Sequence, residues 1–108
     1  AWATTTCRKW EVNSDTASHF LQVTIDLKTY DAKLAEEIKL RMSEIRDSVL
    51  LMFAGQDPYE VVTPQKREYF RKEIFNLANK AMGVDPKKKP KDKELPIKGV
   101  YFTTFVLQ

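Results

Sequence analysis

The chain has few of the residues from which reactive and cofactor-binding sites are commonly built. Its 108 residues include one cysteine, one histidine and three glycines. A single thiol cannot form an intrachain disulfide, and one cysteine with one histidine cannot complete a structural zinc site. Because Gly55, Gly83 and Gly99 stand far apart, a dinucleotide-binding fingerprint and a P-loop are both excluded. The sequence therefore predicts no cofactor and no metal, and no group of residues in it argues for catalysis.

Long hydrophobic runs are also missing. The longest unbroken apolar stretch is Val49–Ala54, well short of the roughly 18 residues that a membrane-spanning helix needs. No secretory signal is visible. The first residue is Ala1 rather than methionine, and we expect the sequence to be a fragment of a longer chain. Its length predicts one domain, residues 1–108, large enough to bury a core.

The positive charge is concentrated in one segment. The net charge is +3, and residues 84–98 hold six lysines against three acidic residues, while the rest of the chain is balanced. For the run Lys87, Lys88 and Lys89 we first expect a solvated loop, and next a contact for anionic lipid headgroups or an acidic partner. Nucleic acid ranks last, because cations are not spread over a folded face and no aromatic residues interleave with these lysines.

Three segments have the pattern of β-strands. Phe20–Lys28 alternates strictly between apolar and polar residues, which is typical of a half-buried strand. Arg8–Asn13 is a suitable hairpin partner for it across a turn-like segment, whereas residues 1–9 as a whole are expected to be loosely ordered. The final segment, Gly99–Gln108, is apolar on both faces if its alternation is regular, so we expect it to be buried on both sides. One face would carry Val100, Phe102 and Val106, and the other Tyr101, Phe105 and Leu107.

Two long helices are predicted between the second and the last strand. Asp31 is a suitable N-cap for a helix that reaches about Phe53. Asp57-Pro58 predicts a short helical turn, and Thr63 followed by proline predicts a second helix that ends near Met82. Apolar residues recur at spacings of three and four in both helices. These core stripes are Leu34, Ile38, Met42, Ile45, Val49 and Met52 in the first helix, and Phe70, Ile74, Leu77 and Ala81 in the second.

These elements together predict an α+β fold. A small sheet of three to four strands would pack one face against the long helix and the second helix, which gives two layers. If the helices are antiparallel, the last strand runs antiparallel to Phe20–Lys28. Three prolines within residues 84–97 predict an irregular Lys/Pro-rich loop before that strand.

Three apolar residues lie off the core stripes and are candidate contacts. At 100° per residue, Leu40 and Leu51 point away from the stripe of the first helix, and Phe75 lies on a flank of the second. Such residues are candidates for self-association or for a partner contact. Coverage by the loop or by the N-terminal segment is an equally good explanation, and the sequence leaves both open.

Four stretches, in this order and spacing, resemble the periplasmic domain of the FliL family, the flagellar basal-body-associated proteins. The resemblance extends from about Trp10 to Gln108, and Val12-Asn13 looks like the family's first strand. Gln65-Lys66 stands where the family usually has Glu-Gly, and the Lys/Pro-rich loop is longer than the turn expected there. The stretches are FLQVTIDL (20–27), EIRDSVLLMF (44–53), VVTPQKREYFRKEI (61–74) and VYFTTFVLQ (100–108).

The resemblance implies a role for the chain and a place in the cell. It implies a single-pass inner-membrane protein whose transmembrane helix precedes Ala1, with a periplasmic domain similar to the stomatin/prohibitin (SPFH) domain and with Gln108 as its natural end. It implies no catalysis and no small-molecule substrate. The partners it implies are further copies of the chain, in rings, and the stator proteins of the flagellar motor, whose torque the rings would support. A stomatin-like membrane scaffold without a flagellar role is the alternative, and a basic-loop module that binds lipid or nucleic acid is a more distant one.

Overall fold

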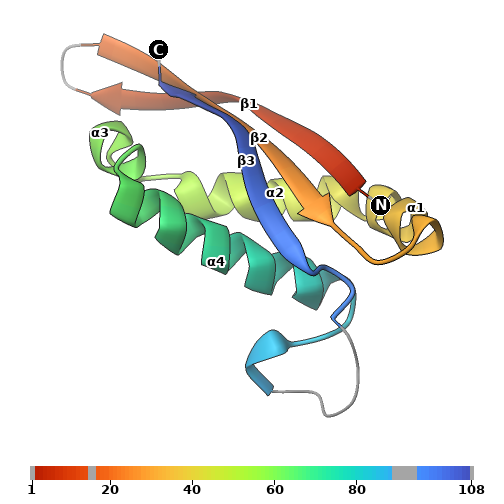
Figure 1. Ribbon diagram of the computed structural model, residues 1–108. Coiled ribbons are helices and arrows are strands. Elements are labelled where there is room, and N and C mark those ends of the chain that lie inside the picture. Colours follow the sequence, from red (N-terminus) through yellow and green to blue (C-terminus); the bar gives the residue numbers. More distant parts are fainter. Residues whose placement is uncertain (1, 15–16, 89–94, 108) are drawn as a thin grey trace.

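A computed structural model describes residues 2–14, 17–88 and 95–107, apart from the side chains of Trp2, residues 5–20 and Pro58 (Figure 1). Strands and helices segregate in the sequence, with a hairpin first, the helices next and one strand last. The elements are β1 (Trp2–Ser14), β2 (Ala17–Lys28), α1 (Ala32–Leu40), α2 (Met42–Phe53), α3 (Pro58–Val61), α4 (Pro64–Ala81), the 3₁₀ turn η1 (Pro86–Lys88) and β3 (Gly99–Leu107).

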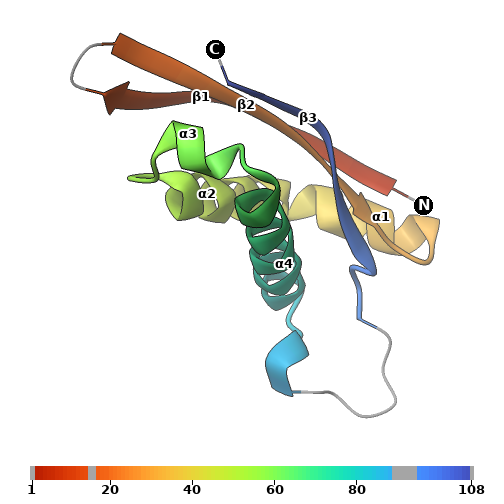
Figure 2. The same cartoon turned by 60° about the vertical axis from the view of Figure 1, so that its left-hand side comes forward.

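The described part of the chain forms one antiparallel sheet of three strands in the order β1-β2-β3. The helices cover one face of this sheet, so the predicted α+β, two-layer arrangement is confirmed (Figures 1 and 2). The predicted hairpin and the antiparallel direction of the last strand are also confirmed. Residues 2–9, expected to be loosely ordered, are part of β1, which pairs with β2 from Trp2↔Lys28 to Cys7↔Val23 before a bulge.

The last strand departs from the prediction because it contains a β-bulge. Thr24 pairs with Thr104 but Ile25 pairs with Phe102, so Thr103 is an extra residue on β3. An extra residue reverses the alternation beyond it. Val100 and Phe102 before the bulge therefore share a face with the two apolar residues after it, and these four oppose the core positions of β2. The pairs are Leu27↔Val100, Ile25↔Phe102, Val23↔Phe105 and Leu21↔Leu107.

Burial of β3 on both faces is likewise wrong. Tyr101 and Val106 remain 43% and 41% exposed. The reason is that β3 is an edge strand covered by helices on one face only, with β2 as its single neighbour within the described residues. The apolar sequence had predicted burial on both sides, but the position of the strand at the edge of the sheet leaves one face exposed.

The predicted long first helix is two helices that meet at Arg41. Asp31 caps α1 as expected, accepting a hydrogen bond from the Leu34 N–H at 2.7 Å. At Arg41 the backbone turns to φ −103° and ψ 9°, and its N–H bonds the Ile38 carbonyl three residues back. The Arg41 guanidinium also donates to the Ala81 carbonyl at the end of α4, at 3.2 Å. The break lets α1 pack against β1 while α2 packs against both β1 and α4.

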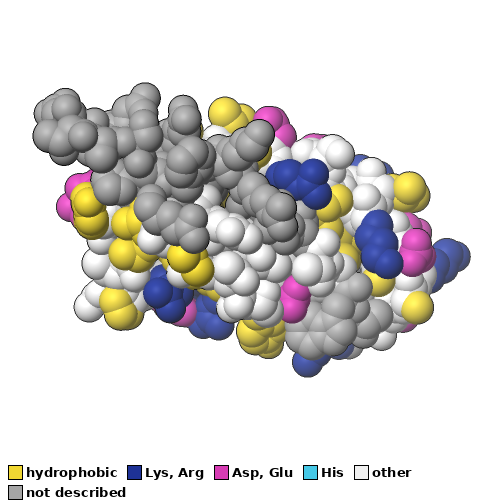
Figure 3. Space-filling model, turned by 90° about the horizontal axis from the view of Figure 1, so that it is seen from above, with side chains coloured by type: hydrophobic (Ala, Val, Ile, Leu, Met, Phe, Trp, Pro, Cys, Tyr) yellow, Lys and Arg dark blue, Asp and Glu magenta, His cyan; other side chains and the backbone are white. Residues whose placement is uncertain are grey.

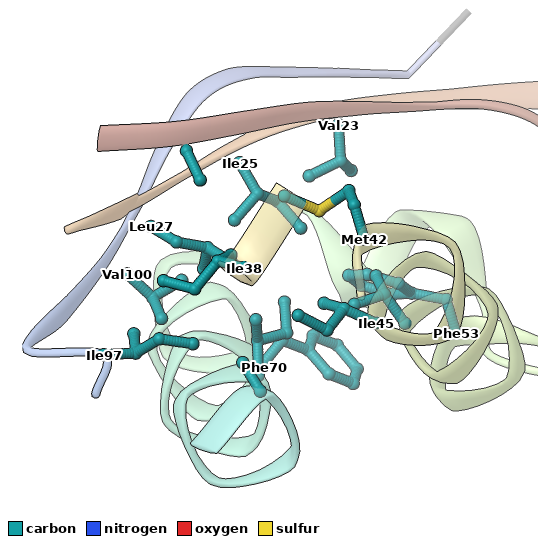
Figure 4. Packing of buried hydrophobic residues seen from close by; sticks show 14 of the residues in the cluster. Val23, Ile25, Leu27, Ile38, Met42, Ile45, Phe53, Phe70, Ile97 and Val100 are labelled. Carbon is teal, nitrogen blue, oxygen red and sulfur yellow. The ribbon is translucent and has the colours of Figure 1, made fainter. Parts of the chain in front are cut away.

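The hydrophobic core lies between β2 and the helices (Figure 4). The predicted inward face of β2 is fully buried, and Phe53 packs its ring 4.6 Å from that of Phe70 between α2 and α4. Most of the two predicted stripes is buried, while Met52, Leu77 and Ala81 are partly buried and packed against the core. Leu34 is also partly buried. The core positions of β2 are Leu21, Val23, Ile25 and Leu27.

The second long helix begins and ends as the sequence predicts. Thr63 caps α4, with Pro64 at its first position. At the other end Gly83 has φ +90°, and the N–H groups of Gly83 and Val84 bond the carbonyls of Lys80 and Asn79 at 2.9 and 3.0 Å. This pair of bonds is a Schellman motif. The chain then forms η1 beyond the end of α4, away from the sheet (Figure 2), although the prolines had predicted no regular structure there.

Candidate interaction surface

A groove runs between α4 and β3. Two adjoining hollows, with volumes of about 510 and 460 Å³, share Glu68, Arg71 and Tyr101 in their walls. Phe75 and Val100 line the first hollow, and Arg67 and Phe105 line the second. Since the same residues bound both hollows, we treat them as one surface, called here the α4–β3 groove.

The α4–β3 groove is predominantly basic. Of the described residues that line it, Arg67, Arg71, Lys72 and Lys98 are basic and Glu68 is acidic. Arg67 and Arg71 come from the same face of α4, because they are four residues apart. Lys98 reaches the groove from the segment that leads into β3. The walls thus combine positive charge with the apolar surface of Phe75, Val100 and Phe105.

Within the groove the charges are held in place by short-range contacts. Arg71 donates to the Glu68 carboxylate at 2.5 Å. This hydrogen bond, with the nearby charges of Arg71 and Lys72, lowers the pKa of Glu68. The same hydrogen bond and the negative charge of Glu68 raise the pKa of Arg71. The Arg67 guanidinium lies 5.0 Å from the centre of the Phe105 ring and donates to the Val62 carbonyl at 3.3 Å. Basic and aromatic side chains therefore lie close together in the groove.

The three predicted contact residues do not form one surface. Leu40 and Leu51 are 86% and 68% exposed, on α1 and α2 respectively. Phe75 is partly buried and lines the α4–β3 groove. Leu40 borders a separate hollow with Glu37 and Arg41. Exposure of the two leucines agrees with the sequence argument. Phe75 instead lies on α4 in the wall of the groove that β3 completes.

The lysine run is only partly within the described residues. Lys87 and Lys88 are exposed in η1, where the Lys87 N–H bonds the Asp85 carboxylate at 3.0 Å, and Lys89 lies outside the described residues. Viewed from above, the described part of the molecular surface shows basic, acidic and hydrophobic side chains interspersed rather than one broad basic face (Figure 3). Neither Lys87 nor Lys88 is among the residues that line the α4–β3 groove.

Comparison with known protein families shows which family the chain belongs to. The model of the flagellar basal body-associated protein FliL matches residues 8–108, nearly the whole sequence. The chain belongs to the FliL family. A search of curated proteins finds no match. FliL is a flagellar accessory family rather than a known enzyme family. The resemblance drawn from the four sequence stretches is therefore confirmed.

Two further observations on this FliL-family chain concern metal-binding clusters and membrane-spanning helices. Among the described residues, no cluster of three or more histidine, cysteine, aspartate or glutamate side chains is placed to hold a metal ion. In the same part of the chain, no helix combines the length and hydropathy needed to cross a membrane.

Sequence reasoning missed the basic side of the groove in this FliL-family chain. The spacing of Arg67 and Arg71 was a usable signal, because residues four apart share one helix face. What that face meets depends on β3, which is about 30 residues further along the chain. Only the packing of α4 beside β3 brings Arg71 and Tyr101 into one wall.

Proposed function

We propose that this chain is a non-enzymatic scaffold of the bacterial flagellar motor that oligomerises around or beside the stator units and supports torque generation. The observation that carries the proposal is the FliL family match over residues 8–108. The chain's contacts would then be with flagellar proteins and with its own copies.

The proposal includes a location. We place the domain in the periplasm, as part of a single-pass inner-membrane protein whose transmembrane helix lies outside residues 1–108. We further propose that its fold is similar to the stomatin/prohibitin (SPFH) domain. The sheet with helices on one face is consistent with the two layers expected of such a domain. A membrane scaffold of this kind without a flagellar role is the competing function.

Motility separates these two functions. The gene is deleted, and swimming, swarming and the number of stator units at each motor are measured with and without the gene restored. We expect reduced motility or stator occupancy that is recovered on restoration. Normal swimming, swarming and occupancy in the deletion strain would remove the flagellar role and leave the general scaffold.

Self-association is tested at the exposed leucines. A charged residue placed in an apolar subunit contact disfavours it by desolvation, so Leu40→Glu and Leu51→Glu should shift sedimentation toward the monomer. Ser43→Glu is the matched control, because Ser43 is exposed on α2 and the change adds the same charge. A strictly monomeric parent at high concentration, or equal sedimentation of all four proteins, would contradict an oligomer built on these leucines.

A further inference from the structure

The outer edge of β3 has features of a strand that receives another strand. It is the edge of the described sheet beside the groove, and it is nine residues long. An edge strand presents unpaired backbone N–H and C=O groups, which natural proteins usually protect with lysine, proline or inward-pointing charge. Between Gly99 and Leu107 there is no charged residue and no proline.

The strand at the opposite edge of the described sheet differs in composition. Its strand, β1, carries Arg8, Lys9 and Glu11 in its sequence. The contrast matters because both edges belong to the same small sheet. The bulge at Thr103 is the one protective device of β3, and it leaves regular pairing on either side of it. An apolar edge of this length with no charged residue and no proline is an aggregation hazard unless a partner covers it.

The groove beside this edge selects the chemistry of the partner. Arg67, Arg71, Lys72 and Lys98 line it, against Glu68 alone. Acidic side chains on a strand lying along β3 would meet these cations. Its apolar side chains would meet Phe75 and Phe105. Strand addition of this kind takes affinity from main-chain hydrogen bonds and specificity from side-chain pockets.

A second copy of this chain is a poor occupant. If it offered β1, that strand has more basic than acidic residues in its sequence and would add positive charge beside a basic groove. If it offered β3 about a twofold axis, the strand would bring no acidic residue, and each copy's Arg71 and Lys72 would be added to the other's. Like charges across an interface cost several kcal/mol. The partner must therefore be a different chain.

We infer that the free edge of β3 and the α4–β3 groove bind an extended, acidic segment of another protein as a fourth antiparallel or parallel strand. The inference goes beyond the flagellar proposal, because it names a binding mode and a ligand chemistry that hold whichever complex the chain serves. Arg71 and Lys72 act as contact residues for the acidic side chains, and the β3 backbone provides the pairing.

The test uses the 108-residue chain and a fluorescent peptide, matched in length to β3, that alternates glutamate with valine and threonine. Two control peptides accompany it. In one, lysine replaces glutamate; in the other, alternate backbone nitrogens are methylated on the pairing edge, which leaves the charge unchanged. We expect anisotropy to report binding of the first peptide only, together with slower amide exchange in β3. Binding should weaken as salt rises.

Charge-reversal variants show where on the protein the peptide binds. The double substitution Arg71→Glu with Lys72→Glu should lower affinity by about tenfold or more. Lys87→Glu with Lys88→Glu makes the same charge change in η1 and should have less than a third of that effect on binding free energy. Circular dichroism and the urea midpoint verify that each variant is folded. Arg71→Gln provides a milder change if the double variant fails to fold, and it should weaken binding in the same direction.

Several results would overturn the inference. Absence of binding up to about 1 mM acidic peptide would do so, since weaker association carries no specific recognition. Equal binding of the methylated peptide would mean attraction by charge alone. An equal loss in the Lys87 and Lys88 variant would place the anion site in η1, and binding of the lysine peptide would remove the charge argument.

Discussion

The buried side chain of Asn79 pairs with the backbone of Ile97 from both ends of its amide. Its Oδ1 accepts from the Ile97 N–H at 2.9 Å, and its Nδ2 donates to the Ile97 carbonyl at 3.2 Å and to the Phe75 carbonyl at 3.1 Å. Both Asn79 and Ile97 are fully buried. This pair attaches the segment that follows the Lys/Pro-rich loop to the last turns of α4, and it sets where β3 begins. It therefore positions one wall of the α4–β3 groove.

Replacing Asn79 should destabilise the protein strongly. Asn79→Ala leaves the N–H and C=O of Ile97 buried without partners, and each unsatisfied group costs about 1–3 kcal/mol. We expect the free energy of unfolding to fall by about 2–4 kcal/mol, measured by urea denaturation. Lys80→Ala is the control, because the neighbouring Lys80 side chain is exposed. A loss below about 0.5 kcal/mol, the size of an ordinary surface change, would contradict this role.

Substitutions of Phe105 and Val106 test whether the bulge in β3 is present. Phe105 packs 6.3 Å from the Phe53 ring and 5.0 Å from the Phe102 ring, whereas Val106 is 41% exposed. Because Phe105 is only partly buried, we expect Phe105→Ala to cost about 2–3 kcal/mol, below the range for a fully buried ring. Val106→Ala should cost under about 1 kcal/mol, the span of strand propensity. Thermal and urea unfolding give both values. If Val106→Ala cost more than Phe105→Ala, Val106 would face the core, as the regular alternation predicted from the sequence requires.

Local sequence signals predicted the ends of the elements, because the groups that cap a helix are close in the chain. Asp31 and Thr63 each bond an N–H three residues ahead, so their role is visible without the fold. The break at Arg41 is different, since neither glycine nor proline marks it. It accompanies a hydrogen bond to Ala81, forty residues away. The bulge at Thr103 likewise depends on its pairing with β2.

The candidate site was less predictable than the fold for the same reason. Leu40 and Leu51 were found because helical spacing alone predicts which side chains leave the core. Phe75 was recognised as off the stripe, but its neighbours come from β3. The groove is formed by two elements together, so its charge could not be predicted without knowing that α4 and β3 are adjacent.

Gly83 offers a test of backbone conformation alone. Its φ is +90°, and a Cβ added there would meet no atom within 4 Å. Any loss of stability in Gly83→Ala therefore comes from the strained conformation rather than from a clash, and we expect about 1–2 kcal/mol. Gly83→Asn should lose less, because asparagine tolerates this region better. Urea midpoints rank the three proteins, and equal stability of parent and alanine variant would mean that the end of α4 rearranges.

Glu68 should titrate below its usual range, and Arg71 is the cause. The hydrogen bond from Arg71 lowers the pKa of the Glu68 carboxyl in the folded state, against about 4.3 in the unfolded chain. A lowered folded pKa means that the ionised group favours folding above pH ~4.3, and that this contribution is lost as the pH falls through the folded pKa. The titration is followed by NMR at the carboxyl carbon of Glu68. Arg71→Gln should raise the pKa toward the ordinary value, and Lys72→Gln should raise it less because Lys72 acts through charge alone. An unchanged pKa in the Arg71 variant would mean that this pair does not form in solution, and the groove would then present Arg71 to a ligand without competition from Glu68.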